Sequence, residues 1–108
     1  MSPSCALRFY VQEQSKLHGI LLHDWLLEDA RRHGVPGGSA FRAIAGYGRH
    51  GDLHEQRFLE LAGQLPVVVE FLLADEQAEA MLARLRAEKV SVFYSRYPIE
   101  FGIIQGNP

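Results

Sequence analysis

Hydrophobic and polar positions follow the patterns of β-strands in four segments of the chain. From Leu7 to Val11 apolar residues occupy every second position, which predicts a strand with one buried face. Residues 39–45 are mostly apolar, and residues 90–97 are rich in β-branched and aromatic side chains. Residues 65–73 form an almost continuous apolar run in which Glu70 is the single charge, which predicts a strand covered on both faces.

Two further segments carry their apolar residues at helical spacing. In residues 17–33 a hydrophobic stripe that includes Leu22 and Leu26 faces a polar side, and the basic residues before Gly34 are typical of a helix end. After Asp75, which is a favourable N-cap residue, apolar side chains recur three and four positions apart. These apolar positions are Ala78, Met81, Leu82 and Leu85.

The resulting order β-α-β-β-α-β predicts an α+β domain with a ferredoxin-like fold and a four-stranded antiparallel sheet. Two helices cover only one face of such a sheet, so we expect other subunits to bury the open face of the 65–73 strand. Residues 46–52 are rich in glycine and predict a loop, whereas residues 53–64 fit either a short helix or a loop. The apolar residues within 99–104 predict a tail docked on the domain, with only residues 105–108 loose.

Length and composition fit a single domain. The chain has 108 residues, of which we expect about 6–104 to form the core, and a formal net charge of −2. This balance argues against nucleic acid as a partner, because proteins that bind nucleic acid present a basic surface. No apolar run approaches the roughly 20 residues of a membrane span, which argues against direct membrane insertion. The first residues do not resemble a signal peptide and Cys5 is the only cysteine, so we expect a cytoplasmic protein without an intramolecular disulfide.

Residues 46–51 match the pattern G-x-G-x-x-G, which in dinucleotide-binding proteins connects a strand to a helix. Glu70 lies nineteen residues after the last of these glycines, close to the spacing of the acidic residue that binds the ribose. However, the chain is too short for the two halves of a doubly wound sheet. Arg42 also interrupts the preceding strand, and acidic residues beginning with Asp52 follow the motif. The pattern therefore favours a glycine-rich hairpin loop, with dinucleotide binding as a minor alternative.

His50 and His54 are four residues apart, so on a helix they would share a face and could bind a metal ion. Asp52 or Glu55 would supply a third ligand. The more common interpretation of such residues is an exposed polar loop, which leaves a metal site as an alternative.

The sequence contains no organised set of nucleophile, acid and base, which favours a non-catalytic protein over a small enzyme on a ferredoxin-like scaffold. Arg8, Tyr10, Arg42 and Glu70 would form a polar set on the open face of the sheet. Such a set is either a pocket or, more commonly, an ion-pair network at an interface.

Four stretches of the sequence resemble the PII-like proteins of domain of unknown function 190, also called UPF0166. They read LRFYV from Leu7, GVPGGSAFRAIAGYG from Gly34, LH from Leu53 and LPVVVE from Leu65. The resemblance extends to about Ile104 and is most specific in the glycine-rich second stretch and in the LPVVVE strand. It implies a homotrimer of ferredoxin-like subunits, related to the PII signal-transduction proteins and to CutA-like trimers.

The resemblance also implies where ligands bind. PII proteins bind nucleotides in clefts between subunits, near the base of the T-loop, which joins the second and third strands and contacts partner proteins. Here GYGRH resembles the base of that loop, GFGRQ, so Gly48 and Arg49 would lie beside a bound phosphate. Gly46 and His50, which replaces the glutamine, would belong to the same effector site. Related CutA-like trimers bind metals, which keeps His50 and His54 open as metal ligands.

Two departures from the PII pattern limit the choice of ligand. The loop before the fourth strand, residues 86–89, contains no glycine, so only Lys89 would contact an anionic ligand there. Residues 49–58 are far fewer than in a PII T-loop and include no tyrosine for modification. These departures argue against ATP sensing with 2-oxoglutarate, and leave an adenine nucleotide with fewer phosphates, another small effector, or no ligand.

The sequence therefore predicts a PII-like, non-catalytic regulatory protein. A small anionic effector, for example an adenine nucleotide, would bind at Gly48, Arg49 and Lys89 and order the T-loop-like segment 46–58 for a partner protein. The family often occurs near genes for fluoride exporters, so the resemblance implies a membrane transporter as one such partner. The part of the segment expected to contact the partner consists of Gly51, Asp52, Leu53 and His54.

Overall fold

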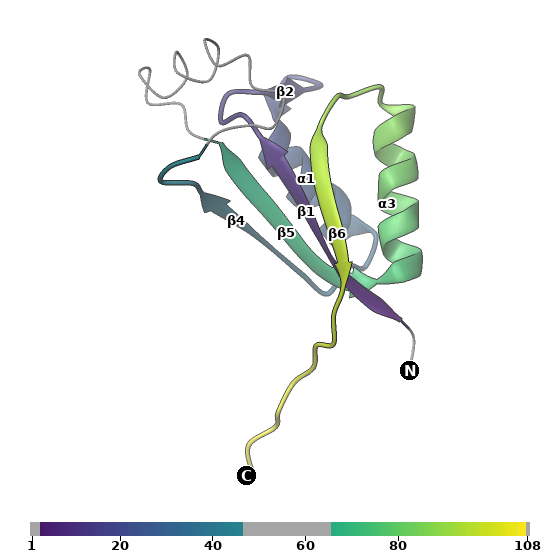
Figure 1. Cartoon of the computed structure of the whole chain (residues 1–108). Coiled ribbons are helices and arrows are strands. Elements are labelled where there is room, and N and C mark those ends of the chain that lie inside the picture. Colours follow the sequence, from purple (N-terminus) through teal and green to yellow (C-terminus); the bar gives the residue numbers. More distant parts are fainter. Residues whose placement is uncertain (1–2, 47–65, 108) are drawn as a thin grey trace.

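The computed structural model describes residues 3–46 and 66–107 (Figure 1). In chain order its elements are β1 (Ser4–Val11), β2 (Lys16–Leu17), β3 (Ile20–Leu21), α1 (Leu22–Arg32), β4 (Gly37–Arg42), β5 (Val67–Ala74), α3 (Asp75–Ala87) and β6 (Phe93–Pro98). Apart from the small β2–β3 hairpin, this is the predicted β-α-β-β-α-β order, and the ferredoxin-like α+β fold is confirmed.

The main sheet has four strands in the order β4-β5-β1-β6, and all neighbouring strands are antiparallel. In the described part of the chain α1 and α3 lie on the same face of this sheet, with α1 behind the strands in Figure 1. The opposite face, which we call the open face, is not covered by any described element of the same subunit.

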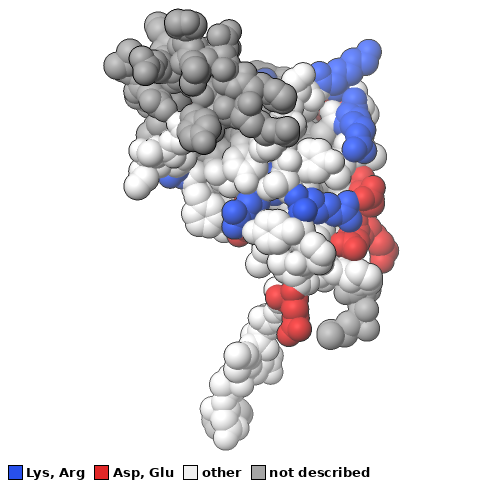
Figure 2. Space-filling view, viewed as in Figure 1, with Lys and Arg blue, Asp and Glu red and all other residues white. Residues whose placement is uncertain are grey.

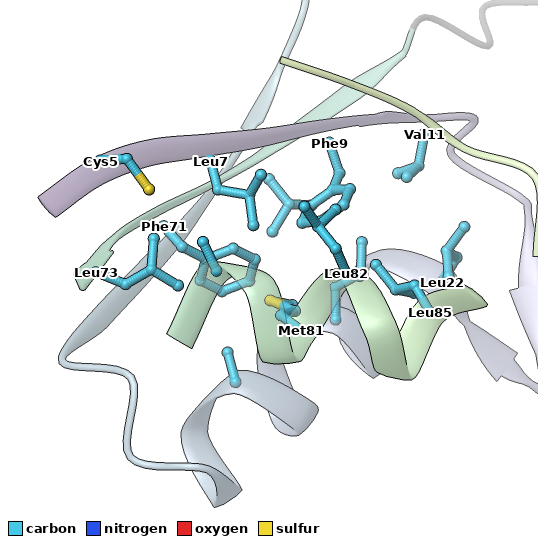
Figure 3. Close-up of a cluster of buried hydrophobic side chains, with 14 of the residues drawn as sticks. Cys5, Leu7, Phe9, Val11, Leu22, Phe71, Leu73, Met81, Leu82 and Leu85 are labelled. Carbon is cyan, nitrogen blue, oxygen red and sulfur yellow. The ribbon is translucent and has the colours of Figure 1, made fainter. Parts of the chain in front are cut away.

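The hydrophobic core lies between the sheet and the two helices (Figure 3). Every second residue of β1 and β5 points toward the helices, as the alternation in the sequence predicts. Phe9 and Phe71 meet edge to face, with ring centroids 6.2 Å apart. Burying a side chain of this size stabilises the fold by roughly 1.5–3 kcal/mol. The other large core side chains include Leu7, Leu26, Leu73, Met81, Leu82 and Leu85.

Gly38 in β4 allows the sheet to pack closely on this core. A Cβ atom at Gly38 would lie 2.6 Å from Cε1 of Phe71 and 3.1 Å from Cδ2 of Leu27. Contacts this short require a side chain to move, so only glycine fits here without rearrangement.

The first helix starts later than predicted, because residues 16–21 form the β2–β3 hairpin instead of a helical turn. His18 and Gly19 form the two-residue turn with positive φ angles of 52° and 80°, as a type I′ turn requires. The N–H of Leu22 donates to the carbonyl of Ser15 over 2.7 Å and closes the base of the hairpin. The predicted start at residue 17 was therefore wrong.

The predicted end of the first helix is confirmed. Gly34 has a φ of 78°, which glycine adopts without steric cost. Its N–H donates to Arg31, and the N–H of Val35 donates to Ala30 over 3.0 Å. These two bonds form a Schellman motif, which satisfies the last carbonyls of the helix.

The second helix begins one residue away from the predicted N-cap. Ala74 occupies the N-cap position, and its N–H donates to Oε1 of Gln77 over 3.1 Å. Asp75 is instead the first helical residue, where its negative charge still favours the helix N-terminus.

A buried ion pair joins the two helices. Arg84 of α3 donates three hydrogen bonds of 2.9–3.1 Å to the carboxylate of Asp29 in α1. Asp29 is only 3% exposed, and the guanidinium of Arg84 supplies the hydrogen bonds that a buried carboxylate needs. The two helices are thus held together by specific geometry as well as by apolar packing.

The C-terminal tail does not dock on its own subunit, so that prediction was wrong. Residues 99–107 extend away from the sheet (Figure 1). Ile103 is 87% exposed and Ile104 is 99% exposed. The apolar character of the tail therefore has no counterpart within the described part of this subunit.

Candidate functional site

The predicted effector site falls partly within the described residues. Gly46 is exposed and is the last described residue before position 66, and Lys89 is exposed just after α3. Gly48, Arg49 and His50, together with the partner-contacting residues 51–54, lie outside the described residues.

Lys89 has an unusual backbone conformation for a lysine. Its φ is +57°, in the left-handed region that follows many helix ends and is usually occupied by glycine. Its N–H donates to the carbonyl of Arg86 over 3.1 Å, so the conformation is part of the helix end. The side chain is exposed.

The β2–β3 hairpin contacts the chain directly next to Lys89. Nε2 of His18 lies 2.5 Å from Oε2 of Glu88, at hydrogen-bond distance. This contact joins the turn of the hairpin to the residue that follows α3. The backbone just before Lys89 is therefore held in place by the hairpin.

Lys89 and the chain ends that flank residues 47–65 lie at the same end of the sheet but at opposite edges. Arg42 pairs with Val67 at this end, and Phe93, the first residue of β6, pairs with Tyr10. Three strand spacings separate β4 from β6, roughly 14 Å. The strand order of one subunit therefore does not place Lys89 beside the end of β4.

The open face carries a central ion pair surrounded by aromatic side chains. Nε of Arg8 donates to Oε2 of Glu70 over 2.6 Å, which raises the pKa of Arg8. The Arg8 guanidinium lies 5.6 Å from the ring centroid of Tyr97, at a distance suited to a cation–π contact. Tyr10 and Ser95 share a hydrogen bond of 3.1 Å. Three members of the predicted polar set, Arg8, Tyr10 and Glu70, therefore lie on this face.

A shallow hollow of about 270 Å³ lies on the open face, lined by Arg8, Phe41, Val68 and Glu70. Its two charged groups neutralise each other, so the hollow offers no free cation to an anionic ligand. Figure 2 shows the same side of the molecule as mostly uncharged, with basic side chains across it and acidic side chains at its right margin and near the start of the tail. Phe41 is 52% exposed and Phe93 is 46% exposed. Exposed aromatic side chains around a neutral ion pair are typical of an interface core.

Arg42 does not join this polar set, and that prediction was wrong. Arg42 pairs with Val67, whose side chain points into the core, and so lies on the helix side of the sheet. There it forms an ion pair with Glu13 and lowers the pKa of that carboxyl group.

The DUF190 family model, described as "Uncharacterized ACR, COG1993", matches residues 4–92. The chain belongs to this family. It is 33% identical to a UPF0166 protein of Aquifex aeolicus over 82 residues, which cover 76% of this chain and 78% of the relative. It is 29% identical to a UPF0166 protein of Methanocaldococcus jannaschii over 79 residues, which cover 73% of this chain and 72% of the relative.

A solved structure shares the fold of this DUF190 protein. It is that of CPII, described as a nitrogen regulatory PII-like protein from Thiomonas intermedia K12, with a TM-score of 0.60. The similarity covers 95% of this chain and 97% of that chain at 16% sequence identity. The DUF190 chain therefore has a PII-like fold.

The alternative metal site of the DUF190 chain, His50 with His54, lies outside the described residues. Within the described ranges no group of three histidine, cysteine, aspartate or glutamate side chains is arranged to hold a metal ion. Cys5 is buried, and this burial raises the pKa of its thiol. In the same ranges, no helix has the length and apolar composition needed to span a bilayer.

The sequence interpretation missed the aromatic part of the open face. Phe93, Ser95 and Tyr97 pair with Tyr10, Arg8 and Ala6 across β1 and β6, so their side chains share this face. The signal was the aromatic content of residues 93–97, which the sequence interpretation used only as evidence for a strand.

Proposed function

We propose that this DUF190 protein is a non-catalytic, PII-like regulatory protein that works as a homotrimer and binds a small anionic effector between its subunits. The observation that carries the proposal is the PII-like fold. CPII, which shares this fold, is described as bound to ADP, AMP and bicarbonate. These ligands are all small anions, and two of them are adenine nucleotides with fewer phosphates than ATP.

The strand order supports a site shared by two subunits. Lys89 and the end of β4 occupy the same end of the sheet at opposite edges. Neighbouring subunits bring opposite edges together when they associate head to tail. Gly46, Gly48, Arg49 and His50 of one subunit would then contact the ligand together with Lys89 of the next.

The backbone of Lys89 also supports a role for its side chain. A non-glycine residue with a φ of +57° costs roughly 1–2 kcal/mol. Glycine would avoid this cost, and a lysine here places a positive charge at the expected cleft. Arg49 would add a guanidinium, which binds phosphate oxygens in a bidentate manner.

The open face supports the assembly rather than the effector. Arg8 and Glu70 already neutralise each other, and exposed Phe41 and Phe93 lie on the same face. Another subunit would cover these apolar groups, as the sequence predicts for β5. Effector binding would order residues 46–58, and positions 51–54 would contact the partner protein, with a membrane transporter as the partner implied by the family.

Isothermal titration calorimetry of the full-length protein tests the proposal. AMP, ADP, ATP, cyclic AMP and bicarbonate are titrated separately, and light scattering measures whether the particle mass is three times the 12.2 kDa of one chain. We expect at least one adenine nucleotide to bind. Absence of heat with all of these ligands at millimolar concentration would refute the effector, and a monomeric mass would refute the shared cleft.

Charge-removing variants locate the site. Arg49→Ala and Lys89→Ala should each weaken binding by about tenfold or more, because each removes a charge-assisted hydrogen bond to phosphate. Arg32→Ala is the matched control, since Arg32 is an exposed arginine at the end of α1, away from the expected cleft. Equal losses in all three variants would indicate a general effect of net charge and contradict the assigned site.

A further inference from the structure

We propose that residues 99–104 of the C-terminal tail add as a strand to the outer edge of β4 in a neighbouring copy of this chain. The inference rests on the trimeric assembly of the proposed function but requires no effector. Its observations are an extended apolar segment and a strand edge of similar length, neither of which is covered by any residue of 3–46 or 66–107.

The tail has lost contact with its own sheet by residue 100. The N–H of Ile99 donates to the carbonyl of Ser4 over 3.2 Å, and within the described ranges this is the last hydrogen bond of the chain. Beyond it Phe101 is 40% exposed, and Ile103 and Ile104 are almost fully exposed. Figures 1 and 2 show the tail as an extended projection from the molecule. An extended segment with free backbone groups and apolar side chains has the properties of a strand that lacks its sheet.

The outer edge of β4 is an open template for such a strand. β4 lies at the end of the sheet, and all six of its residues are exposed. The N–H of Ala43 donates to Pro66 over 2.9 Å, so alternate residues from Ala43 backward direct their backbone groups toward β5. Gly38, Ala40 and Arg42 therefore direct their N–H and C=O groups outward.

The composition of β4 does not protect this edge. Natural edge strands commonly carry charges, proline or bulges that prevent pairing with other chains. In β4, residues 37–41 have no charge and no proline, and Arg42 is paired with Glu13. An edge of this kind is expected to be covered in the working assembly.

The tail cannot reach the outer edge of its own β4. It follows β6, which lies at the opposite side of the sheet, and it leaves the sheet in a direction away from the strands (Figure 1). A tail that pairs with the β4 edge therefore comes from a second copy of the chain. Each subunit then donates one tail and accepts one, and such head-to-tail contacts form a ring where the rotation between subunits closes, as in the proposed trimer.

Two variants test the two halves of the contact. Deletion of residues 101–108 removes the donated strand, and Ala40→Pro removes one outward N–H while leaving the bonds to β5 in place. Each should raise the dissociation constant of the assembly by about tenfold or more in sedimentation experiments from micromolar to nanomolar protein. The matched controls are deletion of residues 105–108 and Ala40→Val. Both should leave the dissociation constant of the assembly unchanged. Circular dichroism verifies that every variant is folded.

Amide hydrogen exchange provides a readout that is specific to the edge. In the full-length protein the outward amides of Gly38, Ala40 and Arg42 should be protected, and deletion of residues 101–108 should expose them. The inward amides of Ser39 and Phe41 should stay protected in both proteins, because they bond to β5.

The outcomes separate this inference from the proposed function. An unchanged assembly in both variants overturns the tail contact and leaves the trimer and its effector intact. A second outcome is that tail deletion weakens the assembly, Ala40→Pro does not, and the β4 amides exchange rapidly in every protein. This outcome refutes pairing with the β4 edge and assigns the tail to another surface. A monomeric full-length protein overturns both proposals.

Discussion

Replacing Lys89 with glycine should make the protein more stable than replacing it with alanine, although glycine destabilises most positions near a helix. Both substitutions remove the same ammonium group, so they differ only in the backbone. At a φ of +57° an alanine keeps the steric cost of the left-handed conformation, whereas a glycine does not.

The size of the difference follows from two opposing quantities. The left-handed conformation costs a non-glycine residue roughly 1–2 kcal/mol. Glycine loses roughly 0.5–1 kcal/mol more conformational free energy on folding than alanine does. The free energy of unfolding of Lys89→Gly should therefore exceed that of Lys89→Ala by about 0.5–1 kcal/mol.

Urea unfolding followed by circular dichroism measures this difference. The two variants are compared at one fixed subunit concentration and without effector, because assembly and ligand binding both shift apparent stability. The urea concentrations at the unfolding midpoints of the two variants should differ by a few tenths of a molar. The dependence of the free energy of unfolding on urea concentration should be the same in both. Both variants should bind the effector equally weakly, since neither has the ammonium group.

Ala87→Gly is the matched control for this comparison. Ala87 is the last residue of α3, two positions before Lys89, and has no positive φ. Ala87→Gly should lower the free energy of unfolding by roughly 0.5–1 kcal/mol. At position 89, by contrast, the glycine variant should have the higher free energy of unfolding. If Lys89→Gly were no more stable than Lys89→Ala, the left-handed backbone at this position, and the argument built on it, would be refuted.

Three further predictions concern the body of the subunit, each measured at fixed subunit concentration. Gly38→Ala places a Cβ 2.6 Å from a buried phenylalanine ring and should cost about 1–3 kcal/mol in urea unfolding, whereas Gly37→Ala, with no atom within 4 Å, should be nearly neutral. Equal effects of these two substitutions would contradict the packing described for β4. Arg84→Ala leaves a buried carboxylate without its main partner and should cost about 3 kcal/mol, whereas the exposed Arg86→Ala should change stability by less than about 0.5 kcal/mol. Burial raises the pKa of the Cys5 thiol, so iodoacetamide at pH 8 should label Cys5 only in urea; fast labelling of the native protein would count against a buried thiol.

Much of the fold could be predicted from local patterns, because those patterns have a direct physical cause. The alternation from Leu7 to Val11 and the apolar run of β5 identify the central strands, since a half-buried pleated strand requires a period of two. Gly34 marks the end of α1 because its left-handed φ suits glycine. The hairpin at His18 escaped prediction because apolar residues in so short a segment fit both a helix and a hairpin.

Features that depend on pairing between distant segments were predicted less well. Arg42 was assigned to the wrong face, because the face of a strand residue follows from its register, here the pairing of Arg42 with Val67. The tail was assigned to its own domain because apolar residues do not by themselves indicate which surface they pack on. Lys89 was named from family resemblance, and nothing in its local sequence reveals a φ of +57°.

The central position of β1 has a consequence for the synthesis of the protein. Arg8 bonds to Glu70, 62 residues later, and Tyr10 bonds to Ser95, 85 residues later. During synthesis β1 therefore precedes both of its neighbours, and it waits while up to 85 further residues are made. At about 5–20 residues per second this interval lasts several seconds, during which an apolar strand has free edges. Folding should thus start late in the synthesis of the domain and be slow for its size, because the decisive contacts are distant in sequence.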